Sequence, residues 1–149
     1  MLDQNQISHL NEYEKELLFN IDIKYGDFLE IVELIQDKTL HIFIKSPIVN
    51  NDLDLFYDNN TIVLHAGQWT HTHPETIDEL ILTIDKIIND EIIIWKVTRP
   101  DGYWYSGHYD LIEWQEDSTM VNEPDSLIEK GDRIERSTFN TFIENKVVE

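Results

Sequence analysis

Hydrophobic residues recur with a helical period most clearly between residues 75 and 90. Pro74 fixes a backbone angle that suits the first turn of a helix, and Thr76 with Glu79 has the spacing of a capping box. A less regular stripe, with apolar residues at intervals of three and four, predicts a second amphipathic helix over residues 5–19. The buried stripe predicted for the 75–90 helix comprises Ile77, Leu80, Ile81, Ile84, Ile87 and Ile88.

Much of the remaining chain alternates apolar and polar residues, which is typical of half-buried β-strands. Residues 28–36 fit a helix as well as a strand, and a hairpin with the clear strand at 39–45 is the favoured interpretation. The Arg-Pro-Asp-Gly sequence at residues 99–102 is a strong turn signal. A short helix is expected at 124–130, and the predicted strands are residues 28–36, 39–45, 54–57, 61–67, 91–98, 103–114 and 135–144.

These elements predict an α+β fold. Strands that follow one another closely and are joined by tight turns form antiparallel sheets. We therefore expect one antiparallel β-sheet of about 5–7 strands, with two α-helices packed on one face. The length of 149 residues, without an internal repeat or a low-complexity linker, predicts a single domain over residues 1–149.

The net charge of the chain limits the classes of partner that it is expected to bind. Thirty acidic residues against eleven basic ones leave a formal net charge of −19. Such a protein repels phosphate backbones, so nucleic-acid binding is not expected, whereas basic proteins are attracted and encountered quickly at low salt. The alternative interpretation of the same composition is an ordinary acidic surface without a dedicated partner.

The sequence predicts a cytoplasmic protein that uses no cofactor and contacts no membrane. It contains no cysteine, which excludes disulfides and thiolate metal ligands. No apolar run approaches the ~20 residues needed to cross a bilayer. The N-terminus lacks a basic segment followed by an apolar one, as a secretory signal would have. Association into a homodimer is left open.

Three of the six histidines, His65, His71 and His73, fall within nine positions just before the 75–90 helix. Residues two apart in an extended segment point to the same side, so His71 and His73 form a workable pair of zinc ligands. His65 or His108, on neighbouring strands, could supply a third nitrogen. The alternative is structural, with one ring packed at the start of the helix and the other on the surface.

Residues 68–74, with the sequence QWTHTHP, resemble the His-x-His-Pro core of JAMM-type metalloproteases, which hydrolyse isopeptide bonds with zinc. The resemblance implies a zinc-dependent hydrolase that uses His71 and His73. In that family a Ser-x-x-Asp sequence follows the proline, and its aspartate is the third protein ligand. Here the serine and aspartate positions hold Ile81 and Ile84, which belong to the predicted buried stripe.

A longer resemblance covers the chain from about Leu53 to Trp114. A strand, a Trp and His-x-His sequence, an amphipathic helix and an aromatic hairpin follow one another as in small acidic bacterial proteins. Those proteins are grouped with the immunity proteins of polymorphic toxin systems. This chain has Trp69-Thr70-His71 where Trp next to His is expected. The resemblance implies a non-enzymatic protein that binds and inhibits a cognate toxin, and this is the favoured interpretation.

A protein that binds a basic toxin domain is expected to gain affinity from exposed aromatic residues and a fast encounter from carboxylates around them. The aromatic residues of the hairpin at 95–114 fit the first role, and the acidic residues beside them fit the second. No catalytic residue is predicted. The predicted partner-binding residues are Trp69, His71, His73, Asp101, Trp104, Tyr105, His108, Asp110, Glu113 and Glu116.

We expect His71 and His73 to hold no stoichiometric zinc, because Ile84 takes the place of the third ligand. The measurement is elemental analysis of protein purified without added metal. One equivalent of tightly held zinc would contradict this expectation and would support the hydrolase.

Overall fold

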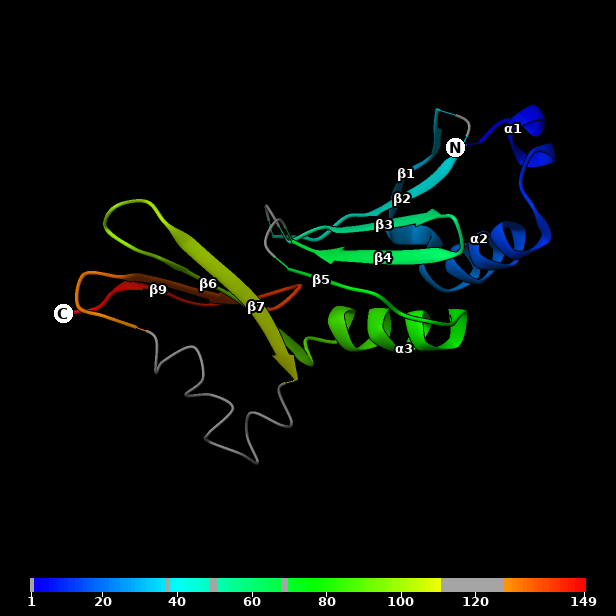
Figure 1. The fold of residues 1–149 in the computed structure, drawn as a ribbon. Coiled ribbons are helices and arrows are strands. Elements are labelled where there is room, and N and C mark those ends of the chain that lie inside the picture. Colours follow the sequence, from blue (N-terminus) through cyan, green and yellow to red (C-terminus); the bar gives the residue numbers. More distant parts are fainter. Residues whose placement is uncertain (1, 37, 49–50, 68–69, 111–127) are drawn as a thin grey trace.

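A computed structural model describes residues 2–36, 38–48, 51–67, 70–110 and 128–149 (Figure 1). It confirms the predicted α+β class. A single 3-10 turn at Gly26–Phe28 joins the second helix to the first strand. In chain order the helices and strands are α1 (Gln4–Ser8), α2 (Glu12–Tyr25), β1 (Leu29–Ile35), β2 (Thr39–Ile44), β3 (Leu53–Asp58), β4 (Thr61–Ala66), β5 (Thr70–Thr72), α3 (Ile77–Ile88), β6 (Ile92–Thr98), β7 (Trp104–Asp110), β8 (Arg133–Ser137) and β9 (Phe142–Val147).

The strands form two antiparallel sheets where one was expected. The first sheet has the order β1-β2-β3-β4-β5 and the second has the order β7-β6-β8-β9. The first sheet ends at the three-residue strand β5, which Pro74 follows closely, and proline has no N–H to continue a ladder. α3 then carries the chain to β6, which lies between two neighbours in the second sheet.

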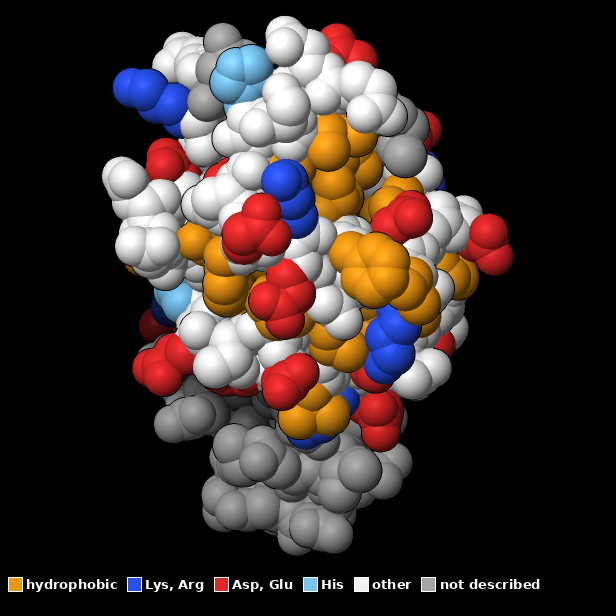
Figure 2. Space-filling model, turned by 90° about the vertical axis from the view of Figure 1, so that its right-hand side faces the viewer, with side chains coloured by type: hydrophobic (Ala, Val, Ile, Leu, Met, Phe, Trp, Pro, Cys, Tyr) orange, Lys and Arg blue, Asp and Glu red, His pale blue; other side chains and the backbone are white. Residues whose placement is uncertain are grey.

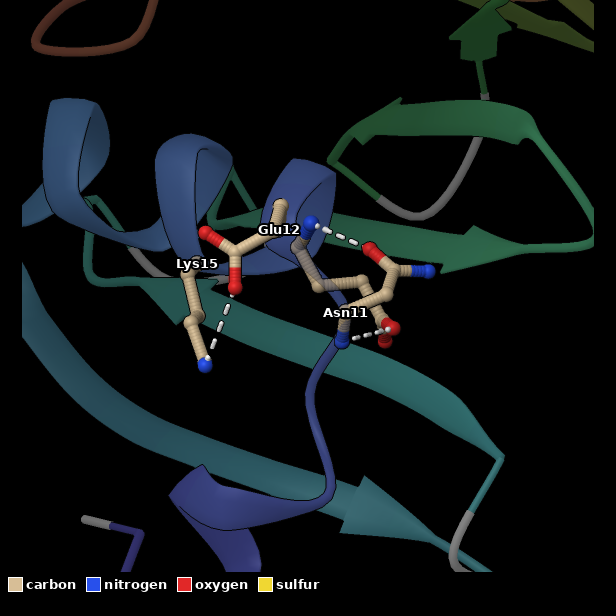
Figure 3. A network of polar contacts seen from close by, with 4 residues as sticks. Asn11, Glu12 and Lys15 are labelled. Carbon is tan, nitrogen blue, oxygen red and sulfur yellow. Dashed lines mark hydrogen bonds and ion pairs between the residues drawn. The ribbon is translucent and has the colours of Figure 1, made fainter.

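The helix predicted at residues 5–19 is two helices, because Asn11 starts a new one. Its side chain accepts the N–H of Glu14 at 2.8 Å, and the carboxylate of Glu14 accepts the N–H of Asn11 at 3.0 Å (Figure 3). This reciprocal capping box satisfies two N–H groups at the start of α2. The exposed ion pair between Lys15 and Glu12, at 3.3 Å, adds little stability.

The ambiguous segment at residues 28–36 is the strand β1, hydrogen-bonded to β2, which confirms the predicted hairpin. The last predicted strand, at 135–144, is instead the end of β8, a turn and the start of β9. The turn is closed because the N–H of Thr138 donates to the carbonyl of Thr141 at 2.8 Å. Alternation alone could not reveal this turn, since it contains neither glycine nor proline.

Two further expectations reach beyond the described residues. The end of the long strand predicted at 103–114 and most of the short helix predicted at 124–130 lie outside them. Residues 128–130 are described and form no helix.

The main core lies between the inner face of the first sheet and the helices α2 and α3, which both cover that face (Figure 1). Leu17 and Ile21 of α2 are fully buried there. The stripe predicted for α3 is confirmed: Ile77, Leu80, Ile84 and Ile87 are buried, and Ile81 and Ile88 are partly buried against the same core.

A polar contact ties α2 to α3. The hydroxyl of Tyr25 lies 2.5 Å from Asp85 Oδ1, and Lys24 Nζ lies 2.7 Å from the other oxygen of that carboxylate. Burial acts to raise the pKa of Asp85, but the hydrogen bonds from Lys24 and Tyr25 outweigh it and lower that pKa. Burial and the neighbouring carboxylate raise the pKa of Tyr25. Asp85 of α3 therefore holds the helix pair together.

The two sheets are joined through a buried polar cluster and one aromatic side chain. Phe139, from the turn between β8 and β9, is fully buried and belongs to the core of the first sheet. Its carbonyl accepts a hydrogen bond from Ser46 Oγ at 2.5 Å. Asn51 Nδ2 lies 2.8 Å from Ser137 Oγ and 2.7 Å from the carbonyl of Thr138. These contacts fix the second sheet against the loop between β2 and β3.

Replacing Ile84 by Ala should lower the free energy of unfolding by about 2–4 kcal/mol, because the removed carbons leave a cavity in a packed core. Urea denaturation gives the value. Leu82→Ala is the matched control, since Leu82 lies on the same helix and its side chain is 58% exposed. The control should change stability by less than about 0.5 kcal/mol. Equal losses at the two positions would contradict the assignment of the buried face.

Candidate functional site

Five aromatic rings lie side by side across the outer face of the first sheet; we call them the ring row. They are His41 on β2, Phe56 on β3, His65 on β4, His71 on β5, and His73 just after β5. Successive ring centroids are 4.5, 5.8, 5.5 and 5.1 Å apart. The first two rings are stacked and the last two meet edge to face. Both arrangements are favourable for neighbouring aromatic rings.

The strand register explains why these rings meet. His41 lies opposite Phe56 in the β2–β3 pair, and His65 lies opposite His71 in the β4–β5 pair. The residues that flank His41 and His65 in sequence point inward and are buried, so alternation sends the rings to the other face. Both α2 and α3 cover the inner face, and His71 and His73 are exposed. The ring row is thus part of the open side of the sheet.

Two carboxylates hold the first ring of the row. Nδ1 of His41 lies 2.8 Å from Glu33 Oε1, and Nε2 lies 2.7 Å from Asp54 Oδ1. A neutral imidazole has only one N–H, so both contacts are hydrogen bonds only when the ring is protonated. His41 lies on the outer face, but its side chain is largely enclosed by these two acids.

The middle ring of the row, His65, has a lowered pKa. Burial lowers the pKa of His65, and the positive charge that His71 would carry lowers it further. The carboxylate of Asp54 acts in the opposite direction. The nearby imidazoles of His71 and His73 therefore discourage His65 from taking up a proton.

A small cavity of about 200 Å³ adjoins the row between β5, α3 and β7. Thr70 Oγ1 lies 2.5 Å from His108 Nδ1 at its wall, so this hydroxyl and imidazole tie the first sheet to the second. Burial and the nearby His71 both lower the pKa of His108. The cavity is lined by Leu64, Ala66, Thr70, His71, Thr72, Thr83, Lys86, Ile87, Ile92 and His108.

The proposed zinc ligands are close to one another, as the sequence predicted, but the described residues supply no complete ligand set. His65, His71 and His73 are consecutive in the ring row, yet no group of three or more His, Asp or Glu side chains in the described ranges is arranged to hold a metal ion. Ile84, at the aspartate position of the JAMM pattern, is fully buried. Asp85, next to it, is bound by α2.

The aromatic hairpin lies on the second sheet, and its turn is at the end of that sheet away from β5 (Figure 1). Trp104 is 48% exposed, and Lys96 Nζ lies 5.3 Å from the centre of its ring. Tyr105 is on the opposite face, edge-on to Trp95 at 5.8 Å. Asp101 accepts the N–H of Tyr103 at 2.9 Å within the turn.

Glycine is required opposite the ring of Trp95. Gly107 is its cross-strand partner, and a Cβ atom there would come within 2.7 Å of the indole. Part of the aromatic content of this hairpin therefore serves packing between strands.

The structure unites some of the predicted partner-binding residues and separates others. His71 and His73 belong to the ring row, and His108 adjoins it through Thr70. Asp101, Trp104 and Tyr105 lie on the second sheet. Asp110 is the last residue of β7, but its side chain is not described. Trp69, Glu113 and Glu116 lie outside the described residues. Glu33, Asp54 and Phe56 were not predicted from the sequence, although their outward position in alternating strands was the available signal.

His71 lies near both His65 and His108, so replacing it tests this geometry directly. Replacing His71 by Gln removes a nearby positive charge and should raise the pKa of both histidines. Histidine ring signals followed by NMR during a pH titration measure both values. A rise at only one of the two rings would contradict the placement of His71 between them.

The lowered pKa values also predict how stability depends on pH. The unfolded chain takes up protons on His65 and His108 near pH 6.5, before the folded protein does. The stability that the neutral rings contribute is therefore complete above that pH and falls as the pH drops toward their folded pKa values. Urea unfolding at a series of pH values should show a smaller decline for His71→Gln than for the wild type.

Comparison with known proteins adds no relative: no family model, no curated protein and no solved structure matches the chain. Among the described residues, no helix is both long and apolar enough to span a membrane. The role of the ring row is therefore inferred from its own residues, geometry and charge.

Proposed function

We propose that this protein is an acidic binding protein of the cytoplasm that inhibits a cationic toxin by covering it with the outer face of the first sheet. One observation carries the proposal. An aromatic row on an open sheet face is bordered by the carboxylates of Glu33 and Asp54. Flat aromatic surface next to negative charge is the chemistry that receives arginine and lysine side chains.

The charge distribution supports a cationic partner. Residues 1–90, which build the first sheet and its helices, contain seventeen acidic and five basic residues. Residues 91–149 contain thirteen acidic and six basic residues. The part of the chain that builds the first sheet and its helices therefore carries the larger share of the net charge, −12 (17 acidic less 5 basic) against −7 (13 less 6). At the end of the molecule that lies at the right of Figure 1, where α1 and α2 are found, acidic side chains stand between open hydrophobic ones (Figure 2). Such a field accelerates the approach of a positively charged surface.

The sheet face already holds one cation in the proposed manner. Lys45 Nζ lies 5.8 Å from the centre of the Phe43 ring, on the same face as the ring row. An arginine of a partner would pack against Phe56 beside the stacked His41 ring and pair with Asp54, whose carboxylate is partly exposed. The planar guanidinium suits both contacts at once.

The face also offers an apolar centre for the affinity that charge alone does not supply. Phe43, Phe56 and Val63 are half-buried on it, and Ile31 and Ile35 of β1 are exposed at its edge. Apolar and aromatic groups at the centre of an interface supply most of its binding energy, while charges at the rim supply speed and specificity.

The toxin assignment rests on the resemblance to immunity proteins together with this surface. A toxin domain that acts on nucleic acid must present cationic side chains to phosphate groups. Carboxylates placed on those side chains would compete directly with the substrate. The inhibitor needs no catalytic group for this.

An oligoarginine peptide should shift the NMR signals of His41, Phe56 and Val63, with oligoglutamate as the peptide control. The double variant Glu33→Gln, Asp54→Asn should bind oligoarginine about tenfold more weakly, because two carboxylates at the contact are lost. Glu16→Gln with Asp78→Asn is the matched control, since it removes the same charge from exposed positions of α2 and α3. Equal weakening by both pairs would show only a general charge effect and would contradict a dedicated face.

Raising salt from low to physiological strength should slow association with a cationic toxin domain much more than it speeds dissociation. Stopped-flow mixing measures the two rates. Phe56→Ala should act mainly on dissociation, provided that its unfolding curve matches that of the wild type. Binding that is indifferent to salt would rule out the electrostatic part of the proposal.

A further inference from the structure

The last strand, β9, is an unpaired edge of the second sheet among the described residues, since β8 is its only strand neighbour there. Its side chains are mostly exposed. Phe142 is 69% exposed and Val147 48% exposed, which is unusual for large apolar residues on a strand. A sheet edge of this kind presents backbone donors and acceptors to any strand that can pair with it.

The backbone contacts of Val148 show which groups of β9 face outward. The N–H of Val148 donates to the carbonyl of Asp132, and its own carbonyl accepts the N–H of Gly131, so both groups point toward the β8 side. Backbone groups alternate in direction along a strand. The N–H and C=O of Val147 and Asn145 therefore point away from β8, toward the open edge.

We propose that two copies of this chain pair through β9, antiparallel, with Asn145 opposite Asn145 of the second copy. In this register the two asparagines exchange both backbone hydrogen bonds across a two-fold axis. Glu144 then faces Lys146 of the other copy, and this contact occurs twice. The β-bulge at Ile143 limits the pairing to the short segment 143–147. The proposal is independent of the proposed function.

The charges of β9 select this register over its neighbours. Glu144 and Lys146 lie on the same side of the strand, within 3.4 Å of each other. A shift of two residues in one direction would place Glu144 opposite Glu144 of the other copy. A shift in the other direction would place Lys146 opposite Lys146. Like charges directly opposite one another are destabilising in an antiparallel pair, and opposite charges are stabilising.

The resulting dimer joins two four-stranded sheets into one continuous sheet. Because the contact is short, association should be weak and should depend on concentration. Sedimentation equilibrium at about 10 μM to 1 mM covers the corresponding range of dissociation constants.

The chain contains no cysteine, so an introduced cysteine can form a disulfide only with the same position of a second copy. In the proposed register the Cα atoms of the two residues at position 145 lie about 5.5 Å apart, within disulfide reach. Asn145→Cys should therefore cross-link into a covalent dimer under mild oxidation. Val147→Cys is the matched control, because the two residues at position 147 would lie about 14 Å apart along the strands. Equal cross-linking at the two positions would overturn the register.

Two further variants test the pairing itself. Asn145→Pro removes an outward N–H and no backbone hydrogen bond to β8, so it should abolish association. It also removes the exposed side-chain bond from Arg133 of β8, and Asn145→Ala, which loses that bond but keeps the N–H, is the control that should still associate. Lys146→Glu places like charges opposite one another and should weaken association at least tenfold, whereas Lys146→Arg keeps opposite charges facing each other and should leave association nearly unchanged. A monomeric wild type at all concentrations, or a dimer unaffected by Asn145→Pro, would overturn the proposal.

Discussion

The burial of only one face of the first sheet is the constraint on which the rest of the structure depends. Leu17 and Ile21 of α2 and Ile84 of α3 are fully buried against the inner residues of its strands. Because side chains alternate along a strand, filling one face commits every second residue to the other. The outer face therefore carries the residues that are not packed in the core, which are imidazoles, carboxylates and half-buried aromatic rings.

The second sheet depends on the first through a few specific contacts. Phe139 is inserted into the core of the first sheet, and Asn51 and Ser46 satisfy polar groups of the turn that carries it. Buried polar groups are costly unless each has a partner, so such a cluster allows few alternative arrangements. At the other contact, Thr70 and His108 join β5 to β7. The cavity beside the ring row exists because these contacts hold the sheets in place.

Acidic residues serve two different purposes in this chain. Asp85 and Asp54 are engaged, the former between two helices and the latter against His41. Exposed carboxylates such as Glu16 and Asp78 bridge no distant elements among the described residues and contribute to the field around the molecule. Repulsion among its like charges destabilises the folded state of a strongly negative domain. The proposed contact with a cationic partner would relieve this repulsion where the first sheet meets it.

The sequence by itself determined the local elements whose signals are short-range. The 75–90 stripe defines α3, and alternation with turns defines the hairpins around residues 40, 60 and 100. It also determined the acidity and the closeness of His71 to His73. These features depend on neighbouring residues alone, so periodicity and composition are sufficient to predict them.

The tertiary structure alone decided which of these elements meet. The division into two sheets, the return of β8 to β6 and the burial of Phe139 all join residues far apart in the chain. The ring row likewise needs β2, β3, β4 and β5 in register, so His41 and Phe56 could not be linked to the histidine pair from spacing. Pairing between distant strands is set by the packing of the whole core, and no local pattern records it.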